Sequence, residues 1–224
     1  PEHPLHRAVR HLVEAGVTVV AATGNRAAPQ VLPPASAAEV IAVGGMDDHN
    51  TCDASCWTMY HSNYGVACDG SAKPDLIAPA EWIAGPIMPE TPVAREARWL
   101  GSILQARDNS ELRHLLDRCY GDLGLPRTAA LEPDSNVYAM LQARINSHKI
   151  VDAHHQFVDG TSVAAPIVTA VVAQMLEANN RLTPAVIRHI LTTTARPLSG
   201  VERSRQGAGV LCAADAVYSA ASDG

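Results

Sequence analysis

The sequence predicts an α/β fold in which a mostly parallel sheet is covered by helices on both faces. Three short apolar runs, at residues 17–22 (VTVVAA), 40–44 and 76–78, are typical of strands that are buried on both sides. Helix-patterned segments alternate with these runs, and that alternation favours parallel strands. At 224 residues and 47% hydrophobic composition, the chain is also long enough to bury the core that such a sheet needs.

The first half of the chain contains a helix and the three strands. A stripe of apolar side chains predicts a surface helix that Gly16 ends. The stripe consists of Leu5, Ala8, Val9, Leu12 and Val13. The strand at 17–22 stops abruptly at Thr23-Gly24-Asn25, and a loop rich in proline and alanine leads to the strand at 40–44. Residues 46–73 form a long polar connection, and Pro79 closes the third strand.

Residues 86–150 differ in character and are predicted to form a helical insertion. Prolines punctuate its start, and helices are expected near 93–107, 110–119 and 135–148. None of these segments carries an apolar face large enough to fold alone, so we expect an insertion within one domain spanning 1–224.

The last part of the chain returns to the α/β pattern. The helix expected at 162–178 is apolar nearly all round, which predicts a central and buried position. Thr183 as the N-cap and Pro184 at the first helical position predict one more helix.

Composition excludes several classes of partner. The net charge is −6, from 17 basic and 23 acidic residues, and no Lys/Arg-rich block is present, so we expect neither nucleic acid nor an anionic membrane as a partner. No apolar run reaches the length of a membrane span by inspection. Because the chain starts at Pro1, we expect it to begin in the middle of a longer protein.

Two local clusters, one of cysteines and histidines and one of acidic residues, are the candidates for a metal site. Three of the five cysteines lie within 52–68, and two of them form an H-x2-C-x3-C-x4-H string with His49 and His61. This cluster is compatible with free thiols, a disulfide or a zinc site. The string lacks the C-x2-C spacing typical of zinc. Asp47, Asp48 and Asn50 are interpreted as a solvated turn rather than a calcium loop. No metal or cofactor is therefore expected.

Ser162 lies in FVDGTSVAAP, at the start of the predicted buried helix. Gly160 permits a sharp turn and a close approach of a ligand to the backbone. A hydroxyl at this position faces the positive end of the helix macrodipole beside unpaired N–H groups, where negative charge is stabilised. An ordinary helix cap is the alternative. Ala164 excludes the G-x-S-x-G turn of the α/β-hydrolases.

Several ordered strings resemble one family, the subtilisin-like serine peptidases (subtilases). GTSVAAPIVTAVVAQML resembles its nucleophile segment, and VTVVAATGN resembles its strand that ends in the oxyanion asparagine. Between and after these lie PASAAEVIAVGG, YHSNYG, KPDLIAPA, LTPAVIRHILTTTA and GAGVLCAADAV, which match the remaining segments in order. The likeness covers roughly residues 4–85 and 155–220.

The resemblance implies the C-terminal portion of a peptidase domain, and therefore an incomplete subtilisin-like fold. It implies that Ser162 is the nucleophile and that Asn25 donates to the oxyanion. The implied substrate-binding residues are Ala21, Ala22, Thr23, Gly24, Gly160 and Thr161. The implied partners are a protein or peptide substrate and the missing N-terminal part of the same domain.

The catalytic Asp and His of the family are not found. The chain has no D-[ST]-G motif and no histidine in an H-G-T context, and His154 and His155 are interpreted as surface residues. We therefore expect both groups upstream of residue 1 and no activity from the chain alone. The alternative function is a non-catalytic relative that binds peptides or acts as a scaffold. Export from the cell is expected only from the family resemblance.

Overall fold

The computed structural model describes residues 3–222, which form two compact units. The first, the sheet unit, combines residues 3–82 with residues 159–222. The second, the helical unit, is Ile83–Val158. Each unit has its own cluster of buried apolar side chains.

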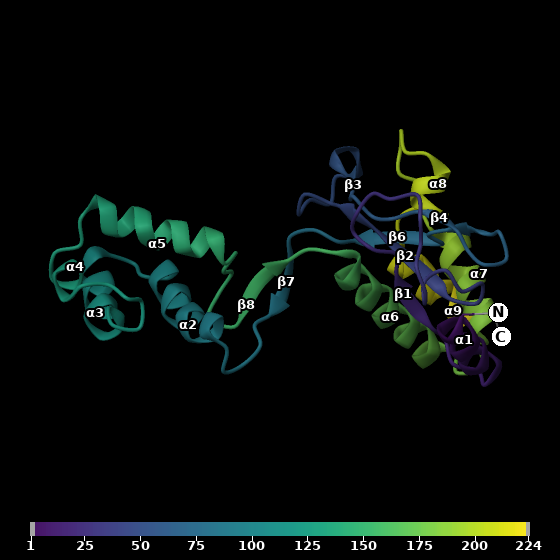
Figure 1. Cartoon of the computed structure of the whole chain (residues 1–224), viewed down its shortest axis with the longest axis horizontal. Coiled ribbons are helices and arrows are strands. Elements are labelled where there is room, and N and C mark those ends of the chain that lie inside the picture. Colours follow the sequence, from purple (N-terminus) through teal and green to yellow (C-terminus); the bar gives the residue numbers. More distant parts are fainter. Residues whose placement is uncertain (1–2, 223–224) are drawn as a thin grey trace. The chain divides into compact units, whose positions relative to one another are not determined.

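The sheet unit is built on three parallel strands, as the sequence predicts. They are β1 (Val20–Ala22), β2 (Ile41–Asp47) and β6 (Leu76–Pro79), with β2 in the centre (Figure 1). The short β3 (Thr58–Met59) runs antiparallel to the end of β2. Two shorter strands, β4 (Gly65–Val66) and β5 (Ala72–Lys73), pair with each other in the long polar connection, and η1 (Ala54–Cys56) is a single 3-10 turn.

Helices cover both faces of this sheet, which confirms the predicted fold class. Ile41 and Val43 of β2 pack with α6 (Thr161–Ala178), α7 (Pro184–Thr194) and α9 (Ala213–Ser222). The alternating residue Ala42 faces the other way, into a cluster that includes Val9 of α1 (Pro4–Glu14). A strand places successive side chains on opposite faces, so β2 contributes to both cores. A short α8 (Arg203–Gln206) precedes α9.

The prediction that the helix at 162–178 is buried nearly all round was wrong, and the predicted surface helix, α1, buries only part of its apolar stripe. Leu5 and Leu12 of α1 are 46% and 47% exposed, because α1 turns His6 and Val9 inward instead, and His6 Nε2 lies 2.9 Å from Ser36 Oγ. In α6, one face packs on the sheet, but the opposite face, with Pro166, Ala170 and Gln174, is exposed. An apolar sequence shows that a helix can be buried, but it does not show what covers each face.

The expectation that no segment is long enough to span a membrane also needs correction. By length and composition alone, α6 is long and apolar enough to cross a membrane, with a mean hydropathy of 1.4 over 18 residues. Its inner face, however, lies along β1, β2 and β6, as the core helices of water-soluble domains do. One such helix is weak support for a span.

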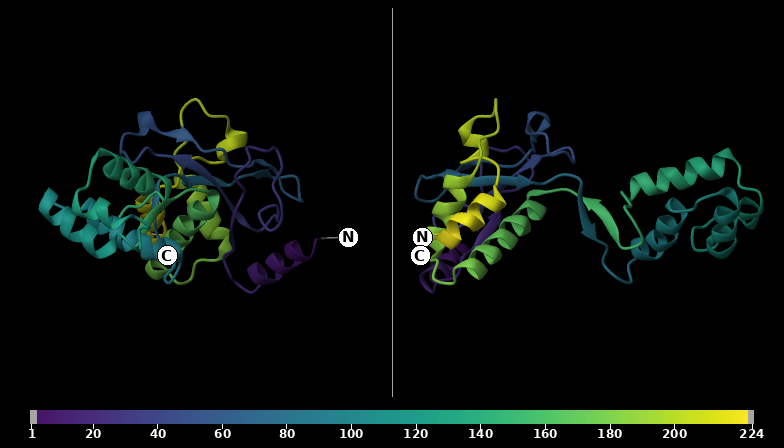
Figure 2. Two further views of the ribbon diagram at one scale, coloured as in Figure 1. Left: turned by 60° about the vertical axis from the view of Figure 1, so that its left-hand side comes forward. Right: turned by 180° about the vertical axis from the view of Figure 1, so that it is seen from behind.

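The helical unit begins and ends in a two-stranded ribbon. Strands β7 (Ile83–Pro86) and β8 (His155–Val158) pair antiparallel, with Ile83 opposite Val158. Between them lie α2 (Pro92–Leu104), α3 (Asn109–Cys119), α4 (Arg127–Leu131) and α5 (Ser135–Ser147), which Figure 2 shows gathered together. Their inward faces form one core in which Leu100 and Leu116 are fully buried. Strands β7 and β8 and helix α4 were not predicted.

A buried ion network joins the sheet to α7. Lys73 is 0% exposed, and its Nζ donates to Asp75 Oδ2 at 2.8 Å and to the Val40 carbonyl at 2.8 Å. The other oxygen of Asp75 accepts two hydrogen bonds from Arg188. Burial lowers the pKa of Lys73, and the Asp75 carboxylate partly opposes that effect. The network satisfies both buried charges.

Candidate active site

The start of α6 lies beside the loop that follows β1. Strand β1 ends at Ala22, and Asn25 then reaches across to Thr161, the first residue of α6. Thr161 N–H donates to Asn25 Oδ1 at 2.9 Å, and Thr161 Oγ1 donates to the same oxygen at 2.8 Å. Thr161 Oγ1 also accepts from Gly24 N–H at 3.1 Å. The structure therefore brings together Asn25 and the Ser162 segment, which are far apart in sequence.

These bonds fix the direction of the Asn25 amide. A backbone N–H can only donate, so the Asn25 atom that faces Thr161 N must be the oxygen Oδ1. The amide nitrogen Nδ2 consequently points away from Thr161. Thr161 is 1% exposed, so it holds the amide from within the protein, whereas the Asn25 and Ser162 side chains are exposed to solvent.

Gly160 leaves the space in which the two candidate groups meet. A Cβ at this position would lie 3.0 Å from Ser162 Oγ and 3.3 Å from Asn25 Nδ2, so both atoms border one small volume. The φ of Gly160 is +139°, which a residue with a side chain rarely adopts. Substitution at Gly160 is therefore disfavoured both by crowding and by backbone conformation.

The polar groups of Ser162 are available for a ligand. Neither its N–H nor its Oγ has a hydrogen-bond partner among residues 3–222, and the N–H belongs to the first turn of the 18-residue α6. The first N–H groups of a helix carry partial positive charge and attract anions. The Ser162 N–H, its hydroxyl and Asn25 Nδ2 thus form a set suited to a carbonyl oxygen that becomes negative.

Asn63 is a positioning residue that sequence reasoning missed. Its Oδ1 accepts from Arg26 N–H at 2.8 Å and from Ala28 N–H at 3.3 Å, and its own N–H donates to the Gly24 carbonyl at 2.8 Å. These bonds shape the loop that carries Asn25. The only signal was its place in YHSNYG, which gave no role to any single residue of that string.

The other residues implied to bind substrate are mostly buried. Ala21 is 8% exposed and Thr23 is 3% exposed, while Ala22 and Gly24 are half-buried. Thr23 Oγ1 is buried without a hydrogen-bond partner among the described residues. A Cβ at Gly24 would lie 2.8 Å from Asn63 Nδ2, so this glycine is needed for loop packing whatever its contact with a substrate.

Tyr60 is a titratable group in the core beside this site. It packs with Ala80 and Ala164, and it is 5% exposed. Burial raises its pKa above 10.0, and the carboxylates of Asp159 and Glu81 raise it further. Its phenol is therefore neutral at physiological pH.

No histidine or carboxylate within residues 3–222 forms a hydrogen bond with Ser162 Oγ. His155 lies on β8 in the helical unit, where its Nδ1 is 2.9 Å from both carboxylate oxygens of Asp152. His154 is exposed in the same segment. The five cysteines are free, and no group of three His, Cys, Asp or Glu side chains in the described part of the chain could hold a metal ion. The disulfide and zinc alternatives thus find no support in these residues.

Comparison with known proteins finds relatives over nearly the whole chain. The family model described as "Subtilase family" matches residues 2–209. The serine protease AprX of Bacillus subtilis (strain 168) is 24% identical over 219 residues, which cover 96% of this chain and 38% of AprX. Among solved structures, the patellamide maturation protease PatA has a TM-score of 0.58 at 21% identity and covers all of this chain. The prenylagaramide maturation protease PagA has a TM-score of 0.55 at 23% identity and covers 96% of it.

The match extends over only part of each relative. The chain spans 58% of the PatA chain, 54% of the PagA chain and 38% of AprX. At these identities, the likeness to the solved structures establishes the fold alone.

Proposed function

The chain belongs to the subtilase family, and from that premise we propose that it carries the nucleophile and the oxyanion donors of a serine endopeptidase. One observation supports the proposal most directly. The Ser162 hydroxyl and the Asn25 amide nitrogen border the same small volume beside Gly160. A helix cap has no use for a second, separately held donor at that point.

The proposed reaction follows the acyl-enzyme route. Ser162 Oγ attacks the carbonyl carbon of a peptide bond, and the carbonyl oxygen gains negative charge. Asn25 Nδ2 and the Ser162 N–H then donate hydrogen bonds to that oxygen. Collapse of the tetrahedral intermediate releases the amine product, and water hydrolyses the ester on Ser162. Thr161 acts through Asn25 as a positioning residue, because it holds the amide in place before a substrate binds.

A serine hydroxyl needs a base, and the base needs a carboxylate to orient it. We propose that both come from a segment of the same domain that precedes residue 1. The unpartnered Ser162 hydroxyl supports this, as does the fact that each relative is considerably longer than this chain. The same absence of a base favours the second candidate, a non-catalytic relative that binds peptides.

Labelling with a fluorophosphonate probe tests these proposals separately. The 224-residue chain should neither react with the probe nor cleave casein, and robust labelling of Ser162 in it would contradict an upstream base. A longer protein that includes the preceding segment should be labelled, and Ser162→Ala should abolish the labelling. If the longer, folded protein stays unlabelled and inactive, the peptidase proposal is wrong and the peptide-binding alternative stands.

Asn25→Ala provides an independent test of the oxyanion role. In the active longer protein, it should reduce kcat by about 10²–10³, because one donor to the transition state is lost. This magnitude, about 2.7–4 kcal/mol, is the one measured for the corresponding donor of subtilisin. An unchanged kcat would remove Asn25 from the mechanism.

A further inference from the structure

A basic and aromatic pocket lies on the helical unit. Arg95, Arg98, Trp99 and Ser102 are spaced i, i+3, i+4 and i+7 along α2, so they share one face of that helix. The buried residues of α2, such as Ala97 and Leu100, belong to the unit's core. With Asp122, the four side chains line a cavity of about 370 Å³.

Trp99 is held as a fixed wall of this pocket. Its Nε1 donates to Asp122 Oδ2 at 2.8 Å, and the guanidinium carbon of Arg118 lies 5.7 Å from the ring centroid. A cation at this distance is attracted to the indole face. The Asp122 carboxylate is thus engaged with the indole, and it makes no ion pair with Arg95, Arg98 or Arg118 within the described residues.

The two arginines of α2 are not neutralised by the protein. Among residues 3–222, neither Arg95 nor Arg98 has a hydrogen bond from its guanidinium or an ion pair. They stand three residues apart on one helix, where like charges repel each other. Elsewhere in the same unit, Arg144 is paired with Glu96 at 2.8 Å. Arg107, Arg113 and Arg127 of this unit have no ion pair within the described residues either, so what distinguishes Arg95 and Arg98 is that they share one helix face with the indole of Trp99.

We propose that this pocket binds the carboxylates of an acidic peptide segment. Planar guanidinium groups match carboxylates through two parallel hydrogen bonds, and the indole provides an apolar wall for the aliphatic part of a Glu or Asp side chain. The pocket sets two guanidinium groups against one carboxylate, Asp122, on a chain whose net charge is −6, so its local charge favours an acidic ligand. Use of the pocket to recruit protein substrates rests on the proposed peptidase function, but the binding itself does not.

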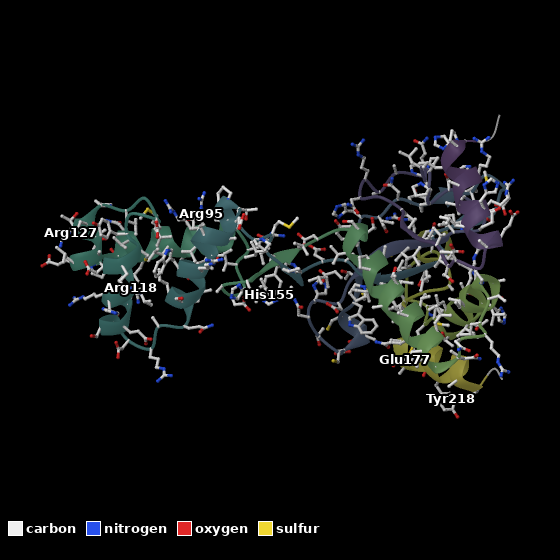
Figure 3. All side chains as sticks on the ribbon, turned by 90° about the horizontal axis from the view of Figure 1, so that it is seen from below. Arg95, Arg118, Arg127, His155, Glu177 and Tyr218 are labelled. Carbon is white, nitrogen blue, oxygen red and sulfur yellow. The ribbon has the colours of Figure 1, made fainter. Side chains whose placement is uncertain are left out.

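Fluorescence anisotropy with the complete 224-residue chain tests the proposal without any turnover. The probe is a fluorescein-labelled peptide of alternating Glu and Leu, and the same peptide with Lys in place of Glu is the negative probe. The double variant Arg95→Glu/Arg98→Glu should weaken binding of the acidic peptide at least tenfold. The matched control is Arg113→Glu/Arg127→Glu, which makes the same charge change on exposed residues of the same unit. Arg127 lies at the far end of this unit from Arg95 (Figure 3), and the control should change affinity less than twofold.

Three outcomes would overturn the inference. One is an equal loss of affinity in the control variant, which would mean that the peptide responds only to overall charge. Another is no binding of the acidic peptide by a chain whose circular dichroism shows it to be folded. The third is tighter binding of single-stranded oligothymidylate that displaces the peptide, which would make phosphates and bases the ligand. Because the assay needs no catalysis, an inactive Ser162 site would leave its result intact.

Discussion

Asp75→Ala should destabilise the sheet unit severely, because it leaves Lys73 as a buried cation without its carboxylate. Lys73 is 0% exposed and would keep only the Val40 carbonyl as a partner. Removing one member of a buried ion pair typically costs about 3–5 kcal/mol. The lysine can escape by losing its proton, but from the ordinary pKa of 10.5 that costs about 5 kcal/mol at pH 7. Both routes thus give a similar upper limit, about 5 kcal/mol, for the loss in the free energy of unfolding.

Differential scanning calorimetry of the 224-residue chain measures this effect. For a unit of this size, each kcal/mol shifts Tm by about 2–4 °C, so a loss of roughly 6–20 °C is expected. The matched control is Asp69→Ala, since Asp69 is exposed and bonds only within its own turn, to Ser71. A shift of less than about 2 °C for Asp75→Ala would refute the reasoning.

A second substitution separates the effect of the uncompensated Lys73 charge from the effect of the lost Asp75 hydrogen bonds. Adding Lys73→Met to Asp75→Ala removes the stranded cation and should restore at least half of the lost stability. If the cost of Asp75→Ala came only from the hydrogen bonds that Asp75 makes to Arg188 and to the Ala42 N–H, Lys73→Met would restore nothing. That result would rule out the unpaired Lys73 charge as the cause of the instability.

Three further outcomes are expected. Tyr60→Phe removes a phenol whose pKa is raised by burial, so the stability of the unsubstituted chain relative to the variant should fall as pH rises from about 10 through the folded-state pKa. An equal difference in unfolding free energy between the two proteins at about pH 9 and about pH 11, measured by urea unfolding, would contradict this. Gly160→Ala should abolish fluorophosphonate labelling of the longer protein, since its Cβ would crowd Ser162 Oγ at 3.0 Å; labelling at the normal rate would show that the loop adapts. Replacing residues 87–154 by Asn-Gly should convert β7 and β8 into a hairpin and leave cooperative unfolding of the sheet unit intact, as monitored by calorimetry, whereas a non-cooperative transition would show that the units depend on each other.

Local signals in the sequence predicted local structure well. Thr183 caps α7 and Pro184 begins it, as expected, because capping and proline geometry depend on a few neighbouring residues. The buried strands were found for the same reason, although β1 is shorter than the apolar run that predicted it. Burial of whole faces was predicted less well. The exposed Leu12 of α1 and Ala170 of α6 show that a hydrophobic pattern does not identify which neighbour covers it.

The candidate site shows the same division. Ser162 and Asn25 were identified from strings that match a family, and the geometry of Gly160 then showed that they border one volume. Asn63 could not be found in this way, because its effect is exerted on a loop nearly forty residues earlier through contacts that only the folded chain brings about. The hydrogen bonds of Thr161 could likewise not be found from sequence. Its hydroxyl is engaged with Asn25 and Gly24, while its expected contact with substrate stays a prediction.

The grip of Thr161 on Asn25 has a consequence for inhibitor design. Because the Asn25 amide has already lost its rotational freedom during folding, ligand binding requires no further loss of side-chain entropy to align it. Because the donor is fixed, it forms a good hydrogen bond with an oxygen in one position and only weak ones with oxygens elsewhere. Under the proposed mechanism, boronic acids, which become tetrahedral on reaction with a serine hydroxyl, should therefore gain far more affinity from an intact Thr161 than amides of the same peptide that stay planar.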